Sequence, residues 1–431
     1  MYMMIADHTC RRKQRMKPEL KNDAFVRKSV IYDRILWFLT AALMISFVVL
    51  ERYTWCSYVY IGILAASVAV FLLQNGIHIG FSFEKFHLFT SLFALYCLIS
   101  MIWAPDRGLT MTIFKSILKS LITMWFFYLH YQKKTDVREL INIIFIAGAV
   151  IAAYAIYRYG FQRIWKVLTV GKRLKNNFTN RNTIGVMSAI TLVIAFSRLI
   201  NKKPSWFLLL ALPCIPMAIA TGSKKTSAIL AVGFIMLVLI RVIRKSPDRR
   251  KTFIRIICVL IMTVVIGYII VSLPIMKSLV KPVTHLLNYF TGDGKSDKST
   301  TRRMNYIDLG YEQFLKTPLL GIGVGNSPLI IGADTYLHAN YIELLACGGI
   351  IGFLVYYAPY IYLIKKSIEL RRIEQNESDL CFVLIILVLV TDIGQVTYYS
   401  KETYFYLMMF FLHIKNLQRL ASQKGDVDLY A

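Results

Sequence analysis

Residues 332–357, GADTYLHANYIELLACGGIIGFLVYY, join a short polar run to an apolar segment that continues to about residue 364. A helix needs about 20 consecutive, mostly apolar residues to cross the hydrocarbon core of a bilayer. The stretch therefore predicts a membrane-spanning helix over 340–364 that begins directly after a single histidine, His338. A polar residue at a helix start is ordinary, but an imidazole is also the commonest general base near neutral pH.

The same apolar pattern recurs along the chain. Of its 431 residues, 56% are hydrophobic and only 17% are charged, which is the composition of a polytopic membrane protein. We predict an all-α polytopic membrane protein with about twelve transmembrane helices and a large, partly helical extracytoplasmic loop. The predicted helices cover 35–50, 56–74, 86–104, 109–131, 139–158, 182–199, 204–220, 225–243, 254–273, 340–364, 379–396 and 402–414.

The charge of the loops predicts the orientation. Short loops rich in lysine and arginine, such as QKKTDVRE and IKKSIELRRIEQ, alternate with nearly balanced ones, such as ERYTWCS and YYSKET. Basic loops stay cytoplasmic, so we expect both termini inside and a multi-pass protein of the cytoplasmic membrane. The expected regions are a basic tail without the apolar core of a signal peptide (1–34), nine helices (35–273), the extracytoplasmic loop (274–339), three helices (340–414) and a second cytoplasmic tail (415–431).

The net charge of +27 would suggest nucleic acid as a partner of a soluble protein, but here the cytoplasmic loops account for it and no such partner is expected. The seven cysteines form no CxxC pair or Cys/His cluster, so they are interpreted as apolar residues rather than metal ligands. Neither a metal nor a cofactor is predicted.

Two segments on the predicted outer side, 159–181 and 274–339, are basic where basic residues are usually depleted. An outward cationic pocket suits an anionic substrate held at the outer leaflet. Asn182 follows Arg181 at the start of the sixth predicted span, and Lys224 and Lys225 open the eighth. Free N–H groups, a positive dipole end and a basic side chain can bind an anion, although such lysines also snorkel to headgroups.

The outer loop contains Arg302 and Arg303 at the beginning of a helical pattern that Pro318 ends. The planar guanidinium fits phosphate oxygens, but a solvated loop arginine is an equal alternative. The glycines in GIGVGN (321–326) follow no strand and predict a sharp turn back to the membrane rather than a nucleotide loop.

Three further residues are pocket candidates. Glu343 follows His338 within the first turns of the tenth span, where a carboxylate suits the helix dipole. Lys115 and Lys119 lie one turn apart in the fourth span, where a charge usually faces a cavity or a partner, and Asp392 is a candidate partner for them.

Four motifs together resemble the bacterial O-antigen ligase and polysaccharide polymerase family. They are TNRNTIG (179–185), ATGSKKT (220–226), the frame from Arg303 through Phe314, Pro318, Gly321 and Gly323, and HANYIELLACGGIIG (338–352). The resemblance covers roughly residues 176–363. In the family the basic residue after the T-x-[ST] turn is often arginine where this chain has Lys224, and the histidine is followed by asparagine where Ala339 here precedes Asn340.

The resemblance implies a membrane glycosyltransferase that uses an undecaprenyl-diphosphate-linked glycan as donor, inverts the anomeric centre and needs no metal. The essential arginine and histidine of the family fall on Arg303 and His338. His338 would be the catalytic base, and Arg303, Lys224, Arg302, Lys225 and Arg181 would bind the diphosphate. Lys115, Lys119, Asn182, Asn340 and Glu343 remain candidates for the pocket wall.

Three functions stay open. The first is a polymerase that joins lipid-linked repeat units into O-antigen, capsule or exopolysaccharide, with a glycan acceptor, membrane lipids and a chain-length regulator as partners. The second is an O-antigen ligase that transfers the glycan to a lipid core. The third is a transporter of bicarbonate or another small anion, but the chain has no inverted pair of broken spans of the transporter kind.

Overall fold

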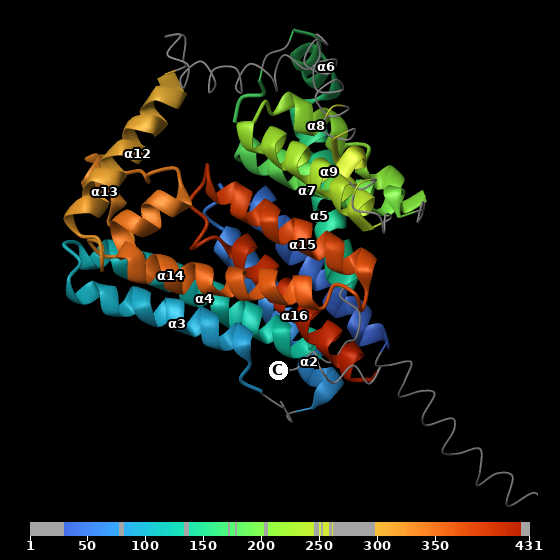
Figure 1. Cartoon of the computed structure of the whole chain (residues 1–431), viewed down its shortest axis with the longest axis horizontal. Coiled ribbons are helices and arrows are strands. Elements are labelled where there is room, and N and C mark those ends of the chain that lie inside the picture. The colour runs from blue at the N-terminus through green and yellow to red at the C-terminus, as the bar shows by residue number, and fades with distance from the viewer. Residues whose placement is uncertain are drawn as a thin grey trace, which may run out of the picture.

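The computed structural model describes residues 30–76, 82–132, 138–170, 173–176, 179–201, 206–244, 250, 253–257, 261 and 298–423. Within these ranges the chain is helical and contains no strand (Figure 1). Eight of the described helices are long and apolar enough to cross a membrane. They are Val30–Val49, α2 (Cys56–Asn75), α3 with η1 (Lys85–Ile102), α4 (Arg107–Tyr131), α5 (Arg138–Tyr159), α7 (Arg181–Ile200), α9 (Lys224–Arg244) and α14 (Asn340–Glu369).

These eight helices coincide with the first six, the eighth and the tenth predicted spans, which confirms the all-α membrane fold. The eleventh and twelfth predicted spans coincide with the helices α15 (Gln375–Asp392) and α16 (Lys401–Gln423), which are not among these eight. The ninth, 254–273, lies largely outside the described residues. The total of twelve and the outer position of the long loop therefore stay predictions.

The predicted seventh span, 204–220, is not one long helix. The structure has a 3-10 segment, η2 (Trp206–Ala211), followed by the seven-residue α8 (Cys214–Ala220). Pro213 lies directly before α8 and Pro216 lies inside its first turn. Proline donates no backbone hydrogen bond and clashes with the preceding turn, which accounts for the interruption of the regular helix at these two positions.

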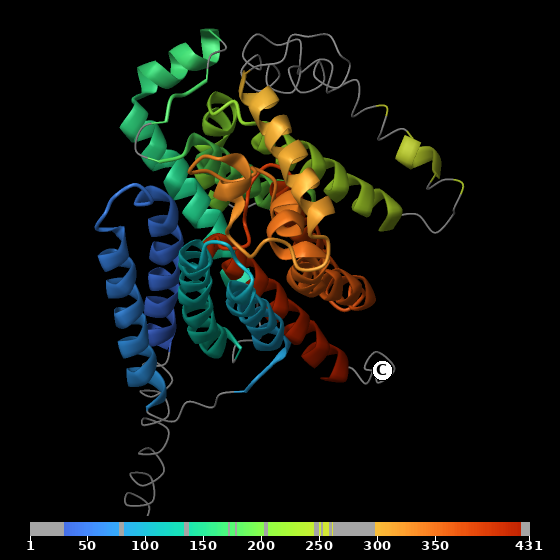
Figure 2. The same ribbon diagram turned by 90° about the vertical axis from the view of Figure 1, so that its left-hand side faces the viewer.

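The helices form two groups joined by α15. One group contains α5, α7, α8 and α9, and the other contains α3, α4, α14 and α16. α15 packs against α9 on one side and against α14 and α16 on the other. α16 lies in the middle of the molecule, where its residues from Thr403 to Ile414 are buried (Figure 1). The helix Val30–Val49 and α2 stand side by side at the edge, with the Phe47 and Tyr60 rings in contact (Figure 2).

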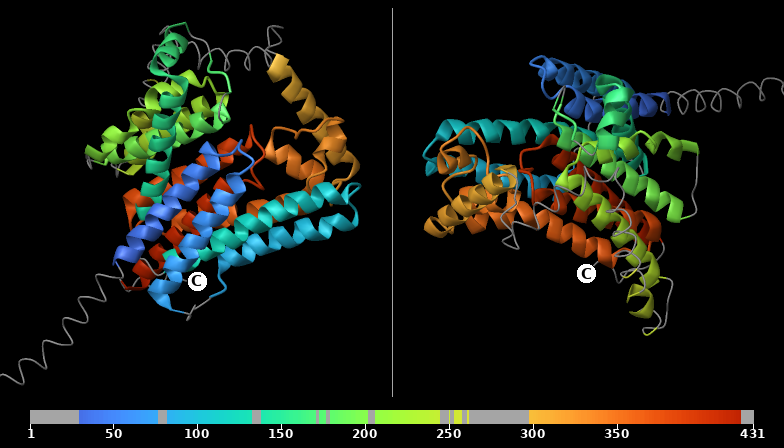
Figure 3. Two further views of the ribbon diagram at one scale, coloured as in Figure 1. Left: turned by 180° about the vertical axis from the view of Figure 1, so that it is seen from behind. Right: turned by 90° about the horizontal axis from the view of Figure 1, so that it is seen from above.

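The predicted outer loop is partly helical, as expected. It contains α12 (Lys298–Lys316) and the short α13 (Ser327–Ile331), and α12 packs on the first half of α14 (Figure 3). α12 begins at Lys298, one turn earlier than the pattern from Arg302 indicates, and it ends before Pro318 as predicted.

The GIGVGN segment is a turn, as predicted, and it is docked on a break in α14. Gly349 has φ +60° and ψ −170°, which interrupts the helix. The turn donates to carbonyl groups released there, since the Ile322 and Gly323 N–H groups bond to Ala346 and Cys347 at 3.1 and 2.9 Å. The N–H groups of Ile350 and Ile351 bond to the residues just before the turn, Pro318 and Leu319, at 2.8 and 3.2 Å. Irregular backbone at membrane depth is tolerated only where such partners satisfy it.

Candidate functional site

A cavity of about 370 Å³ lies where several helix ends meet beneath α12. Its wall includes the end of the helix Val30–Val49, the N-termini of α7, α9 and α16, and the connection between α15 and α16. α12 contributes Arg303 and the loop before α14 contributes Tyr336 and His338. Residues from seven separate parts of the chain therefore converge on one space.

Four of the residues predicted from the sequence line this cavity, and they are His338, Arg303, Lys225 and Asn182. They come from four separate motifs of the chain, more than 150 residues apart at the extremes. The basic helix starts and the arginine of the 274–339 segment, which the sequence suggests independently, thus line the same cavity as the histidine. Their catalytic and binding roles remain predictions.

His338 is held in an uncommon backbone conformation. Its φ of +62° is the only positive value among the described residues other than glycine. A non-glycine residue in this region costs about 1–3 kcal/mol and persists only where the surroundings fix it. The imidazole lies between two tyrosine rings, parallel to Tyr306 at 6.0 Å between centroids and tilted against Tyr336 at 4.4 Å.

The electrostatic surroundings keep His338 neutral. Partial burial, together with the positive charges of Arg303, Lys225 and Arg302, lowers the pKa of His338 to about 4. Burial disfavours the imidazolium, and like charges disfavour it further. At neutral pH the ring is therefore unprotonated and one nitrogen can accept a proton.

The side chains of Lys225 and Lys224 make different contacts. Lys225 lines the cavity and its ammonium donates to Gln395 Oε1 at 2.6 Å. Lys224 points instead to α12, where its ammonium donates to Thr300 Oγ1 at 2.5 Å. The family resemblance implies both lysines for the diphosphate, but of the two only Lys225 lines the cavity. One helical step of about 100° separates the two side chains.

The other predicted residues lie outside the cavity wall. Arg302 is exposed next to Arg303, and Arg181 donates to the Leu174 carbonyl at 2.6 Å, which holds the loop before α7. Lys115 and Lys119 are exposed on α4. They are not partnered by Asp392, which accepts from the uncharged Tyr357, Asn340 and Thr397.

Asn340 and Glu343 are buried supports of the cavity rather than lining residues. Asn340 Oδ1 accepts from the backbone N–H groups of Thr397 and Tyr398 at 2.8 and 3.2 Å, which fixes one wall. Glu343 accepts from Ser327 Oγ at 2.5 Å and from the Leu337 N–H at 2.9 Å. Because Leu337 precedes His338, the carboxylate of Glu343 anchors the loop that carries the candidate base.

Some residues in or beside the cavity could not be recognised as site residues from the sequence. Tyr306 and Tyr336 flank the imidazole, and Glu51, Lys401 and Glu402 line the wall. Glu51 opens the ERYTWCS loop, and Lys401 and Glu402 lie in YYSKET. Both loops look ordinary because each has nearly equal numbers of acidic and basic residues, and only the fold brings them together.

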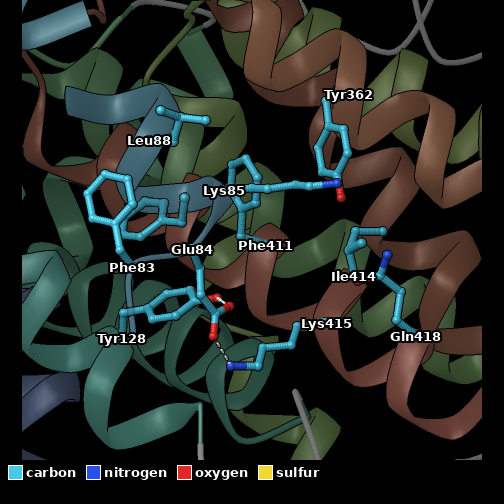
Figure 4. Close-up of a pocket in the computed structure, with 11 residues that line it drawn as sticks. Phe83, Glu84, Lys85, Leu88, Tyr128, Tyr362, Phe411, Ile414, Lys415 and Gln418 are labelled. Carbon is cyan, nitrogen blue, oxygen red and sulfur yellow. Dashed lines mark hydrogen bonds and ion pairs between the residues drawn. The ribbon is translucent and has the colours of Figure 1, made fainter. Parts of the chain in front are cut away.

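A second cavity, also of about 370 Å³, lies between the start of α3 and the end of α16 (Figure 4). Its Glu84 carboxylate is paired with the Lys415 ammonium, and Lys85 lies 4.7 Å from the centroid of the Tyr362 ring. Lys415 is thirteen residues beyond Glu402 on α16, or roughly 20 Å along the helix. None of the predicted site residues lines this cavity, and its one carboxylate is already paired with Lys415.

Comparison with known proteins identifies a family over part of the chain. Residues 206–357 match the model of a family described as O-antigen ligase. This range contains Lys225, Arg303 and His338, and it confirms the family resemblance for the three motifs that lie within it, whereas TNRNTIG (179–185) lies before the matched range. A search of curated proteins finds no match. The family match gives no support to the anion-transporter alternative.

Proposed function

We propose, on the premise that residues 206–357 form an O-antigen ligase family domain in a multi-helix membrane protein, that the chain is a polysaccharide polymerase. It joins oligosaccharide repeat units linked to undecaprenyl diphosphate at the outer face of the cytoplasmic membrane. The observation that carries the proposal is the cavity in which His338, Arg303 and Lys225 meet.

The cationic side of the cavity binds the diphosphate of the donor. The guanidinium of Arg303 offers a planar fork for phosphate oxygens, and Lys225 adds a point charge. Both charges stabilise the diphosphate as the bond between its oxygen and the anomeric carbon breaks. The electron pair of that bond leaves on the diphosphate, so no acid has to protonate the leaving group.

His338 takes the proton of the acceptor hydroxyl while the oxygen of that hydroxyl attacks the anomeric carbon. Attack from the face opposite the diphosphate inverts the anomeric centre. Burial and the surrounding cations lower the pKa of His338 to about 4. A bound diphosphate offsets those cations, which raises the pKa and strengthens the base when the donor is in place.

The second candidate function is transfer of a finished glycan to a lipid core, because the matched family is described as O-antigen ligase. The two functions share the donor and differ in the acceptor. Purified protein incubated with lipid-linked repeat units alone distinguishes them. We expect a ladder of lengthening products, whereas transfer that begins only when a lipid-core acceptor is added identifies a ligase and overturns the polymerase assignment.

A further inference from the structure

The cavity that carries the proposed active site has two ends of opposite charge. Arg303 and Lys225 lie within electrostatic range of His338, and Glu51 lies within electrostatic range of Glu402, so the charged lining residues form a cationic end and an acidic end. Tyr336 lies within electrostatic range of both Arg303 and Glu51, so one side chain is close to both ends. The proposed reaction assigns a task to the cationic end only.

The two carboxylates have acceptor capacity that the protein leaves unused. Glu51 accepts from Thr179 Oγ1 at 3.0 Å, and Glu402 accepts from Ser400 Oγ at 2.5 Å. They lie within electrostatic range of each other. In the described part of the chain, no lysine or arginine nitrogen lies within 4.0 Å of either carboxylate. Each has further lone pairs for a donor group.

Lys401 does not neutralise this end by contact, although it directly precedes Glu402. Its ammonium lies over the rings of Phe47 and Tyr60, at 5.3 and 4.9 Å from their centroids. This cation–π arrangement keeps the lysine beside the wall and leaves the carboxylates facing the cavity. The remaining lining adds the amide of Asn182 and the rings of Tyr399 and Tyr406.

Carboxylates, an amide and aromatic faces around one space fit a ligand that carries many hydroxyl donors on an apolar ring frame. A sugar has this chemistry, because each hydroxyl can donate to a carboxylate oxygen and the ring carbons can lie on an aromatic face. The two carboxylates outnumber the single ammonium of Lys401 in the lining, so a phosphate or carboxylate on the ligand would meet an excess of negative charge here. Such like-charge contact rejects a wrong partner.

We propose that the Glu51–Glu402 end of the cavity binds the acceptor glycan and selects a terminal sugar without an anionic substituent. The proposal rests on the function proposed above and specifies its acceptor. The diphosphate then lies at the cationic end, the acceptor sugar at the acidic end, and His338 lies within the same cavity to receive the proton. A phosphorylated lipid core is disfavoured at this end by its charge, which agrees with a polymerase.

The test measures binding of the acceptor separately from binding of the donor. Repeat-unit oligosaccharide released from its lipid lacks the diphosphate, so it can serve only as acceptor when lipid-linked repeat units are supplied at a fixed concentration. Glu51→Gln and Glu402→Gln should each raise the KM for the released oligosaccharide about tenfold, the size expected for a lost charged hydrogen bond. Binding of undecaprenyl diphosphate, the probe of the cationic end, should stay unchanged. The control is Glu312→Gln on the exposed face of α12.

Composition of the repeat unit gives a second readout, since the sugar at its non-reducing end should carry no phosphate or carboxylate. An acceptor KM within twofold of the Glu312→Gln control, or an anionic terminal sugar, would overturn the inference while the transferase function stands. Loss of undecaprenyl diphosphate binding in the Glu51→Gln variant would show that this exposed carboxylate contributes to donor binding, which would also overturn the inference. A wild-type protein that transfers no glycan would overturn the proposed function itself.

Discussion

Lys224 and Lys225 are adjacent in sequence and differ in what they contact. The structure turns Lys225 into the cavity and Lys224 toward Thr300 on α12. We predict that Lys225→Ala lowers kcat/KM for the lipid-linked donor at least about tenfold, because a charge-assisted contact to the diphosphate is worth about 1.5–3 kcal/mol. Lys224→Ala is the matched neighbour and should have a much smaller effect on kcat/KM, measured with purified protein. Equal losses in the two variants would contradict the assignment of Lys225 to the diphosphate.

Arg302 offers a test of the electrostatic environment of His338. Its positive charge is one cause of the lowered pKa of about 4. Removing that charge in Arg302→Gln makes the imidazole easier to protonate, so the pKa of His338 rises and more of the base is lost at acidic pH. We expect the acid limb of the pH profile of kcat/KM to move to higher pH. The control is Lys316→Gln, at the far end of the same helix, which should leave the acid limb at its wild-type pH. An acid limb that also stays at its wild-type pH in Arg302→Gln would show that a group other than His338 sets it.

The residue types of the site can be predicted from the sequence, but the direction in which each side chain points cannot. Motif spacing and the positive character of outer loops suffice to predict His338 and Arg303, and the cavity contains both. The choice between Lys224 and Lys225 depends on the rotation of α9, and the entry of Glu51 and Glu402 depends on contacts between remote loops. Neither is encoded in local spacing.

At the scale of elements, the break in α14 joins the outer segment to the membrane helices. A Cβ on Gly349 would lie 2.3 Å from the Leu319 carbonyl oxygen, and its φ of +60° disfavours any side chain. Gly349→Ala should therefore destabilise the protein by about 1–3 kcal/mol, the typical cost of such strain, and loosen the turn at Gly321. A clear fall in Tm in detergent is expected.

Gly62→Ala is the control for this substitution, because a Cβ at Gly62 on α2 meets no atom within 4 Å. The control should match the wild type or gain slightly in Tm, since alanine favours the helix. An unchanged Tm for Gly349→Ala would contradict the role assigned to the break.

Long apolar elements are predicted well from sequence because length and hydropathy are local properties. The eight membrane-length helices agree with predicted spans. The seventh prediction, 204–220, is wrong as a continuous helix, because hydropathy ignores the prolines at 213 and 216. The broken α14 is equally invisible to hydropathy, since its two halves are apolar and only the partner turn reveals the break.

At the scale of the whole molecule, the proposal requires the cavity to face the outer side. Glu312 on α12 and Arg372, before α15, should then lie on opposite sides of the membrane. In intact cells carrying a cysteine-free background, a membrane-impermeant maleimide should label Glu312→Cys, whereas Arg372→Cys should react only after permeabilisation. The reverse pattern would contradict the predicted cytoplasmic termini.

The central claim is that one cavity, with His338 as base and Arg303 at the diphosphate, transfers a lipid-linked glycan. The most direct measurement compares wild type, His338→Ala and Arg303→Ala, purified to equal abundance and incubated with lipid-linked repeat units. The account predicts a ladder of polymer lengths from the wild type and no elongation by either variant. A normal ladder from His338→Ala would contradict it.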